Sequence, residues 1–339
     1  MNLEKRFDLV TRNVQEIITR EELKVLLKDK KSPSAYWGTA PTGKVHIGYL
    51  IPILKISDFL KAGFKFKILI ADLHAHLDDQ KTPWSLLDSR AIYYQEIIMA
   101  LFDALNIDYS KLIFVRGKDF QTNSEYVVDV LRMSALTTLS RVKRSAAEVV
   151  RFGKEPKLGG FIYPLMQTED IPALEADVAY SGVDQRMIYA LSRELLPELG
   201  HKKPICVFTP MLPGLTGGKM SASDVKNKID LLDSEKETER KVNSAYCKEG
   251  DIKDNGVLAF CEYFLFPYKG KLKIERAKKF GGDVHYENYK ELENDFVKKK
   301  LHPADLKKMV SGELNILLEP VRKKFEKKEK LLKEAYPTS

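Results

Sequence analysis

The chain has 339 residues, 44% of them hydrophobic, and carries a net charge of +8 at pH 7. This length suffices for a sizeable core and for two domains. No apolar run approaches the roughly 18–20 residues that a membrane span needs, and the mixed-charge N-terminus has no apolar stretch typical of a secretory signal. The three cysteines lack CxxC spacing, which argues against zinc and disulfides and for a reducing compartment. The positive excess fits either a solvated lysine-rich surface or a polyanionic partner.

Residues 1–30 predict a helical covering segment of mixed charge. From residue 34 to about 210, short apolar runs rich in β-branched and aromatic residues alternate with longer helical patterns. The strand-length runs are 34–38, 66–71, 111–115 and 204–208. This alternation predicts an α/β domain with a mostly parallel sheet. In such sheets, ligands bind beyond the carboxyl ends of the strands.

Residues 83–105 predict an amphipathic helix. Apolar residues recur there at steps of three and four, at Leu87, Ala91, Tyr94, Ile98, Leu101 and Leu105. This spacing gives one apolar helical face. Pro83 suits the first turn of such a helix.

The character of the sequence changes after Lys219. Helical patterns occupy 235–247, 254–266, 288–300 and 304–334, with short strand candidates near 271–275 and 283–286. We therefore expect a smaller, mainly helical second domain and divide the chain into 1–224 and 225–339. Glutamates interleave with the lysines near the C-terminus, which favours a solvated helix face over a polybasic arm.

Residues 36–49 read YWGTAPTGKVHIGY, a predicted strand end, a turn and a helix start. The unpaired N–H groups of such a helix start can bind an anion. Gly48 lets a flat ligand lie against the backbone, and His46 can donate to a phosphate. The spacings of a Walker A loop and of the GxGxxG fingerprint are both absent. On these local grounds alone, an ordinary turn with a satisfied surface histidine is the simpler reading.

A second glycine-rich stretch, PGLTGGKMSAS, ends at Ser223. Its glycines precede Lys219, which is flanked by hydroxyl residues. A flexible loop of this kind can bring Lys219 onto a phosphate chain as charge develops during a reaction. By itself, the stretch also fits a plain surface loop.

Together and in this order, the two stretches resemble the signatures of class I aminoacyl-tRNA synthetases. His46–Tyr49 resembles HIGH, with Tyr49 in place of the second histidine, and 219–223 resembles KMSKS, with Ala222 in place of lysine. Similar variants occur in eukaryotic-type members. The resemblance implies a Rossmann-like catalytic domain and a smaller anticodon-binding domain.

In this family both stretches bind one ATP molecule, which Mg²⁺ accompanies as part of the substrate. The first stretch cradles the adenosine and the α-phosphate, and the second clamps the β- and γ-phosphates. The catalytic residues that the resemblance implies are His46, Lys219, Ser221 and Ser223. The implied ATP-binding residues are Gly38, Thr39, His46, Gly48, Lys219 and Met220.

Further segments resemble the tyrosyl-tRNA synthetases of archaea and eukaryotes. They are ADLHAHLDD, FIYPLMQTED, SGVDQRMIYALSRELLP, KFGGD and LHPADLKK. The resemblance covers about residues 8–337. It implies a tyrosine–tRNA ligase activity that forms tyrosyl adenylate from L-tyrosine and ATP and then esterifies the terminal ribose of tRNA(Tyr).

A tyrosine pocket needs a polar pair for the buried phenol and further groups for the ammonium. Asp170 and Tyr36 match the family's phenol-binding pair, and leaving such groups unpaired would reject phenylalanine. The other matches to tyrosine-binding residues are His74, Tyr163, Gln167 and Gln185. Tyr163 and Gln167 lie one helical turn apart, so both can face a pocket; an amphipathic packing stripe is the alternative. Phe120 and Gln121 match another stretch lining this pocket.

His74 and His76 stand beside three aspartates, which invites a metal-site interpretation. Positions i and i+2 of a helix diverge, so the two histidines would not share a ligand set. We therefore expect no metal site in the protein, and magnesium that enters with ATP rather than in a dedicated cage.

Transfer RNA contacts are also implied by the resemblance. Arg144, in a basic segment, matches a residue that helps to read the first base pair, although a neighbouring lysine of the relatives is Met187 here. Phe280 and Asp305 match the residues that stack on and hydrogen-bond to the first anticodon base. A core phenylalanine and an ordinary helix-start aspartate are the alternatives.

Two rival functions stay open at this point. A tryptophanyl-tRNA synthetase would share the fold and chemistry, but Asp170 with Tyr36 favours a phenol. A non-catalytic RNA-binding paralogue would not need His46 and Lys219. Family members are homodimers, so we expect tRNA(Tyr), L-tyrosine, ATP and a second copy as partners, no membrane, and a cytoplasmic location.

Overall fold

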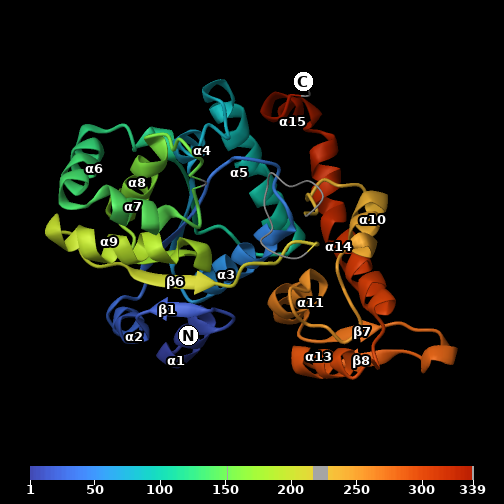
Figure 1. Ribbon diagram of the computed structural model, residues 1–339. Helices are drawn as coiled ribbons and strands as arrows, with labels where there is room; N and C mark the ends of the chain where they lie inside the picture. The colour runs from blue at the N-terminus through green and yellow to red at the C-terminus, as the bar shows by residue number, and fades with distance from the viewer. Residues whose placement is uncertain (151, 217–227, 338–339) are drawn as a thin grey trace.

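The computed structural model describes residues 1–150, 152–216 and 228–337 (Figure 1). Its centre is a sheet with the strand order β1-β6-β5-β2-β3-β4. The strands are β1 (Glu16–Ile18), β2 (Ser34–Thr39), β3 (Lys65–Ile70), β4 (Leu112–Arg116), β5 (Val178–Gly182) and β6 (Ile205–Thr209). Neighbouring strands pair in parallel, except that β1 pairs antiparallel with β6. The predicted α/β fold with a mostly parallel sheet is confirmed.

The predicted strand runs form β2, β3, β4 and β6, and two further strands were not predicted. The segment 1–30, expected to be helical, instead folds as α1 (Leu3–Thr11), β1 and α2 (Arg20–Asp29). β1 contributes only three residues, held by pairing with β6. β5 reads VAYSG and lies between β2 and β6. Both strands depend on tertiary pairing, because their short runs carry a weak local signal.

The predicted helix at 83–105 is present as α5 (Leu87–Ala104), preceded by the 3₁₀ turn η2 (Trp84–Leu86). Pro83 precedes this turn rather than lying in the first turn of the helix. The six apolar residues of the predicted face are all buried. Tyr93 and Ile97 are buried too, because α3 (Leu50–Lys61) packs on one side of α5 and C-terminal helices pack on another.

A group of helices surrounds α8 on one side of the sheet (Figure 1). Helix α8 (Gly159–Ala173) contacts α6 (Ser124–Leu136), α7 (Leu139–Ala146), α9 (Arg186–Glu198) and the short α4 (Asp72–Leu77). Short 3₁₀ turns complete this half at η1 (Ile47–Tyr49), η3 (Gly117–Asp119) and η4 (Val183–Gln185). α8 is therefore held from several directions, which fixes the side chains that it carries.

The C-terminal part is mainly helical, as predicted. It contains α10 (Glu235–Ser244), α11 (Gly256–Phe260), the π-helical turn η6 (Cys261–Leu265), α12 (Phe266–Lys269), α13 (Tyr289–Val297), α14 (Pro303–Glu326) and α15 (Glu329–Ala335). The two predicted strands are β7 (Leu272–Ile274) and β8 (Val284–Tyr286), paired antiparallel. The pattern at 304–334 is thus two helices, interrupted at Lys327 and Lys328.

The C-terminus returns to the first half of the chain. Helices α14 and α15 pack on α5, and Figure 1 shows them running beside it. The Tyr336 hydroxyl donates to the Gly43 carbonyl at 2.6 Å, and Arg90 Nε donates to the Ala335 carbonyl at 3.0 Å. One hydrophobic cluster includes buried residues from the sheet and from these helices. The last helices therefore brace the first glycine-rich stretch, which contains Gly43.

Two further findings concern membrane-spanning helices and the state of the cysteines. Within the described ranges, no helix combines the length and the apolar character that crossing a bilayer requires. Cys206, Cys247 and Cys261 are free thiols, and each is buried.

Candidate active site

A cavity of about 300 Å³ lies at the carboxyl ends of the parallel strands. Thr39, Gly182 and Thr209, the last residues of β2, β5 and β6, line it. The chain runs from β2 to β3 and β4 on one side and from β5 to β6 on the other. The cavity therefore lies where the strand order reverses, which is the usual ligand site of an open α/β sheet.

Phe120 and Gln121, which were expected to line the tyrosine pocket, do not line this cavity. The other described residues that the sequence assigned to tyrosine or ATP all line it: Tyr36, Gly38, Thr39, His46, Gly48, His74, Tyr163, Gln167, Asp170 and Gln185. They come from strand ends, from α4 and α8, and from the turns η1 and η4. The fold thus gathers residues from distant parts of the sequence at one cavity.

The first glycine-rich stretch enters the helix through a short 3₁₀ turn. This turn, η1, begins at Ile47, and α3 follows directly. His46 caps the turn, since its Nδ1 accepts a hydrogen bond from the Gly48 amide at 3.2 Å. The hydroxyl groups of Thr39 and Tyr49 lie 2.8 Å apart, which holds Tyr49 against the end of β2. Tyr49, the residue that departs from the family signature, is therefore part of the support of this stretch.

His46 is arranged as a neutral hydrogen-bond donor. Because Nδ1 accepts the Gly48 amide, the proton of the neutral ring lies on Nε2. Burial, together with the positive charge of Lys228, lowers the pKa of His46 to about 3. The imidazole is therefore uncharged near pH 7 and has one N–H group left to donate.

The residues Lys219, Met220, Ser221 and Ser223 of the second stretch lie outside the described residues. Both flanks of the segment 217–227 can be placed. Residues 209–212 line the cavity. On the other flank, the Ile47 amide donates to the Ile229 carbonyl and the Leu231 amide to the Val45 carbonyl, each at 3.0 Å. The chain thus lines the cavity before this segment and re-enters the described structure beside the first stretch.

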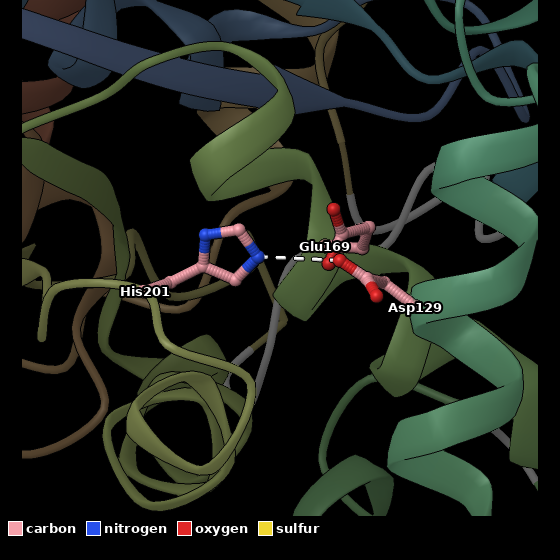
Figure 2. Close-up of side chains that lie close together, drawn as sticks. All are labelled: Asp129, Glu169 and His201. Carbon is pink, nitrogen blue, oxygen red and sulfur yellow. Dashed lines mark hydrogen bonds and ion pairs between the residues drawn. The ribbon is translucent and has the colours of Figure 1, made fainter.

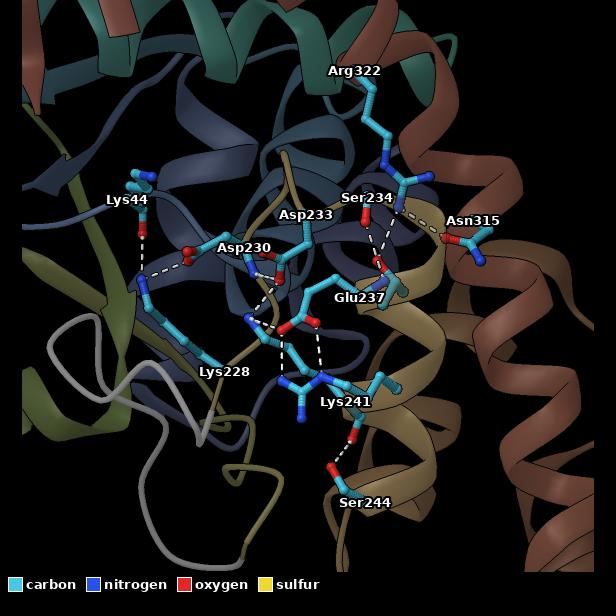
Figure 3. A network of polar contacts seen from close by, with 12 residues as sticks. Lys44, Lys228, Asp230, Asp233, Ser234, Glu237, Lys241, Ser244, Asn315 and Arg322 are labelled. Carbon is cyan, nitrogen blue, oxygen red and sulfur yellow. Dashed lines mark hydrogen bonds and ion pairs between the residues drawn. The ribbon is translucent and has the colours of Figure 1, made fainter. Parts of the chain in front are cut away.

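A buried polar network holds the second of these flanks (Figure 3). Lys228 Nζ lies 2.5 Å from Asp230 Oδ1 and 3.3 Å from the Lys44 carbonyl oxygen. Asp233 Oδ2 accepts from the Asp230 amide at 2.9 Å and pairs with Lys241 Nζ at 2.6 Å. Both lysine side chains are at most 4% exposed. The buried ion pair between Asp233 and Lys241 therefore ties this flank to α10. The hydrogen bond from Lys228 to the Lys44 carbonyl ties it to the first stretch.

Tyr36 and Asp170 form a polar end of the cavity. Each is only 1% exposed. The Tyr36 hydroxyl lies 3.0 Å from the hydroxyl of Tyr189. Asp170 Oδ1 accepts from Gln121 Nε2 at 2.7 Å and from the Tyr126 hydroxyl at 2.9 Å. Burial raises the pKa of Asp170 to about 7. These partners orient a hydroxyl and a carboxyl group into the cavity, where both can bind a buried hydroxyl of a ligand.

His74 lies beside this polar end. Its Nδ1 is 3.3 Å from Gln121 Nε2, and its Nε2 is 3.7 Å from Asp170 Oδ2. The ring packs edge-on against Tyr163, with 4.6 Å between the centroids. Burial lowers the pKa of His74 to about 4, so the ring is neutral near pH 7.

The two histidines of α4 diverge as the sequence predicts. His76 Nδ1 lies 3.0 Å from the Thr82 carbonyl oxygen, and the ring packs edge-on against Trp84. His76 therefore does not share a ligand set with His74. Within the described ranges, one group of three potential metal ligands has its ligand atoms within 4.8 Å of one another, and it does not line the cavity: Asp129, Glu169 and His201.

A second polar region of the cavity comes from α8 and η4. Tyr163 and Gln167, one helical turn apart, both line the cavity. Gln167 Nε2 donates to Gln185 Oε1 at 3.1 Å, while Gln167 Oε1 is buried and has no hydrogen-bond partner in the described part of the chain. A buried acceptor of this kind is satisfied when a ligand donates to it. This region therefore suits an ammonium group.

The residues assigned to transfer RNA lie away from the cavity. Arg144 is exposed on α7. Phe280 is 60% exposed at the end of η7 (Lys278–Phe280), so the alternative of a core phenylalanine is wrong. Lys279 Nζ lies 5.0 Å from the Phe280 ring centroid. Asp305 is half-buried in the first turn of α14, where a carboxylate also favours the helix.

Several supporting residues were not predicted from the sequence. Tyr126 and Tyr189 orient Asp170 and Tyr36, and Lys228 anchors the flank beside His46. Tyr126 and Tyr189 are far in sequence from Asp170 and Tyr36, and Lys228 is far in sequence from Lys44, whose carbonyl it contacts. The local patterns around them indicate only amphipathic helices or a lysine-rich loop, so the pairing could not be read from spacing.

Comparisons with known proteins agree with this geometry. The family model described as tRNA synthetases class I (W and Y) matches residues 28–319. A tyrosine–tRNA ligase of Haloarcula marismortui is 50% identical over 341 residues, which cover 99% of this chain and 98% of the relative. The tyrosyl-tRNA synthetase of Archaeoglobus fulgidus, solved with L-tyrosine, matches with a TM-score of 0.89 at 42% identity, over 95% of this chain and 99% of that one. The Pyrococcus horikoshii enzyme, also solved with L-tyrosine, matches with a TM-score of 0.92 at 30% identity over 100% of both chains. The chain therefore belongs to the class I tRNA synthetases of the tryptophan and tyrosine group.

Proposed function

We infer that the chain is a tyrosine–tRNA ligase. In the first step, the carboxylate of tyrosine attacks the α-phosphorus of ATP, and pyrophosphate leaves. In the second step, the terminal ribose hydroxyl of tRNA(Tyr) attacks the carbonyl of tyrosyl adenylate, and AMP leaves. The observation that carries this function is the pair Tyr36 and Asp170, oriented at one end of the cavity that the first glycine-rich stretch also lines. The names of the relatives, which cover nearly the whole chain, support it.

Tyrosine binds with its phenol between Tyr36 and Asp170. A phenol hydroxyl can donate to one of these groups and accept from the other, whereas phenylalanine would leave both buried groups unpaired. Gln167 Oε1, which has no hydrogen-bond partner among the described residues, accepts from the ammonium group of tyrosine. Tyr163 and Gln185 flank this group. His74, whose ring packs edge-on against Tyr163, lies beside the ring of the bound tyrosine.

ATP binds across the ends of β2 and η1. Gly38, Thr39 and Gly48 line the cavity there, and the neutral His46 donates its Nε2 proton to an α-phosphate oxygen. A neutral donor is available at every pH at which the enzyme works, since the pKa of His46 is lowered to about 3. The reaction needs no protein nucleophile, so catalysis consists of positioning and stabilisation of charge on the leaving pyrophosphate.

The second stretch supplies the remaining charge. Lys219, with Ser221, Ser223 and the backbone near Met220, contacts the β- and γ-phosphates. The positions of the two flanks support this role, because residues 209–212 line the cavity and Ile229 and Leu231 are hydrogen-bonded to Ile47 and Val45. Mg²⁺ accompanies ATP and contacts its phosphate oxygens.

The tRNA is bound by both parts of the chain. The acceptor stem meets the exposed Arg144 of the catalytic domain, residues 1–224, and the first anticodon base meets Phe280 and Asp305 of the domain 225–339. The exposure of Phe280 supports a stacking role, since an unpaired base can lie on an exposed ring.

The functional assembly is a homodimer, with α6 at the interface. Helix α6 and the start of α7 expose several large apolar side chains, each 43–64% exposed: Val127, Val128, Leu131, Leu136 and Leu139. Neighbouring large exposed apolar residues are typical of an interaction surface. The enzyme works in the cytoplasm, which agrees with three buried free thiols.

Exchange of labelled pyrophosphate into ATP tests the function and separates it from its rivals. We expect exchange that depends on L-tyrosine and not on L-tryptophan or L-phenylalanine. Exchange driven by tryptophan alone would identify the other specificity of this family. Absence of exchange with every amino acid, from a folded protein, would support the non-catalytic alternative.

A further inference from the structure

Three side chains outside the active site converge from separate elements (Figure 2). Asp129 comes from α6, Glu169 from α8, and His201 from the segment between α9 and β6. One ligand atom from each lies within 4.8 Å of the other two. Elements far apart in sequence thus bring an imidazole and two carboxyl groups together.

Glu169 is the buried member of this cluster. It is only 5% exposed, and its Oε2 has no hydrogen-bond partner among the residues that the structure describes. A buried carboxylate without a compensating cation is costly. Burial and the carboxylates of Asp129 and Asp170 raise the pKa of Glu169 to about 8, although the positive charge of Arg132 opposes this rise. Either a proton or a cation must satisfy the group.

The distances fit a cation. His201 Nε2 and Asp129 Oδ2 are 3.2 Å apart, and two ligands held at about 2.1 Å from one ion at a tetrahedral angle are about 3.4 Å apart. Arg132 occupies only the other oxygen of Asp129, with Nη1 at 2.8 Å from Oδ1. Asp129 Oδ2 therefore remains in the cluster, where a carboxylate oxygen of Glu169 lies within 4.8 Å of the ligand atoms of the other two residues.

The ligand types select the kind of ion. An imidazole nitrogen with two carboxylates suits zinc, manganese or another divalent transition metal, whereas magnesium and calcium prefer oxygen ligands alone. The side chains of His201 and Asp129 are 34% and 18% exposed, so an ion can enter from solvent toward the buried Glu169. Three protein ligands leave at least one position for water.

We propose that Asp129, Glu169 and His201 bind one divalent transition-metal ion. The ion would link α6, α8 and the segment before β6, and would hold α8 in place. Asp170, next to Glu169, lies in the proposed tyrosine site, so the metal would brace the element that carries this site. The proposal departs from the sequence expectation of no metal in the protein, because positions 129, 169 and 201 form no ligand motif. It does not depend on the proposed ligase function.

Metal binding by the full chain tests this directly. Protein stripped with EDTA is dialysed against micromolar zinc sulfate or manganese chloride, and bound metal is measured by mass spectrometry beside thermal melting. We expect one ion per chain and a rise in Tm. Glu169→Gln and His201→Gln should each weaken binding at least about tenfold, since loss of only an outer partner of a ligand costs 10–100-fold.

Two substitutions of exposed residues serve as controls. Glu125→Gln on α6 and His285→Gln on β8 remove the same chemical groups elsewhere and should leave binding unchanged. The proposal would be overturned if both cluster variants bound the metal as tightly as the wild type does. It would also be overturned if the control variants lost binding too. A wild-type chain that binds no ion would overturn it as well, in which case Glu169 is satisfied by a proton. His201 is partly exposed, so its variant keeps the test valid even where Glu169→Gln fails to fold.

Discussion

Gln121 Nε2 donates to Asp170 Oδ1 across 2.7 Å, although 49 positions separate the two residues in sequence. The same amide nitrogen lies 3.3 Å from His74 Nδ1. Because the pKa of His74 is lowered to about 4, this ring is neutral and its Nδ1 can accept the second amide proton. Asp170 and His74 line the cavity while Gln121 lies behind them. The orientation of the polar end of the site thus depends on a residue that a ligand does not reach.

Asp170→Ala should impair the use of tyrosine far more than the use of ATP. The substitution leaves a buried phenol hydroxyl with one partner fewer, which costs about 1–3 kcal/mol, or roughly 5–150-fold in kcat/KM for tyrosine. The KM for ATP should change little. Pyrophosphate exchange with each substrate varied in turn measures both values, and the exposed Asp119→Ala serves as the control. An equal effect on both substrates would place Asp170 outside the tyrosine site.

Gln121→Met keeps the side-chain volume and removes both amide contacts. Asp170 then keeps only the Tyr126 hydroxyl as a partner on Oδ1. We expect the KM for tyrosine to rise about fivefold to tenfold, corresponding to loss of one hydrogen bond of about 1 kcal/mol or slightly more. Discrimination against phenylalanine should fall in parallel. Thr122→Ala, one position along and exposed, should leave both values unchanged. Unaltered tyrosine kinetics in Gln121→Met would show that Asp170 orients itself without this amide.

The fold was largely predictable because its strands and helices carry local signals. β2, β3, β4 and β6 contain the apolar runs that predicted them, although the edge strand β4 is only partly buried, and α5 shows its apolar face in every turn. β1 escaped prediction because three residues within a helix-like segment form a strand only by pairing with β6. The predicted helix at 304–334 was too long because no proline or glycine marks its interruption at Lys327.

The site was predictable where a residue belongs to a recognisable motif, and not where it acts through a distant contact. Tyr36 and Asp170 were assigned through the resemblance, and both line the cavity. Their supports Tyr189 and Tyr126 lie 153 and 44 positions away from them in sequence. Such pairings form only when the chain folds, so the periodicity of the sequence does not indicate them.

The neutral state of His46 makes a prediction about acid stability. Its pKa is lowered from 6.5 to about 3, so the unfolded chain binds one more proton than the folded chain between these values. The stability that this group contributes is complete above pH 6.5 and is lost as the pH falls toward 3. His46→Asn keeps a side-chain acceptor for the Gly48 amide but cannot titrate.

The difference in the free energy of unfolding between wild type and His46→Asn should therefore shrink as the pH falls. The expected slope is up to about 1.4 kcal/mol per pH unit below pH 6.5. Urea unfolding at several pH values between 5 and 8 measures it, with the exposed His285→Asn as a control. A difference that stays constant from pH 8 to pH 5 would mean that His46 keeps an ordinary pKa in the folded chain.

Lys241→Met should destabilise the protein strongly. The Lys241 side chain is 4% exposed and lies 2.6 Å from Asp233 Oδ2, so its removal leaves a carboxylate largely buried without its cation. Breaking such a pair costs about 3 kcal/mol or more. The neighbouring Arg240→Met is a matched control, because Arg240 is 66% exposed and its surface ion pair should contribute little to stability. Urea denaturation gives both values. Similar values for the two variants would show that the network in Figure 3 adds little to stability.

Leu131→Asp should convert the proposed dimer into monomers. Leu131 is 62% exposed on α6, and a charge at the centre of an apolar interface stays unpaired when the copies meet. Light scattering should give about twice the chain mass of 38.8 kDa for the wild type and a single chain mass for the variant. Ile316→Asp on α14 introduces the same charge at a residue that is 71% exposed, and should leave the dimer intact. A dimer that survives Leu131→Asp would place the interface elsewhere, because a buried, unpaired aspartate in each copy would oppose association through this face.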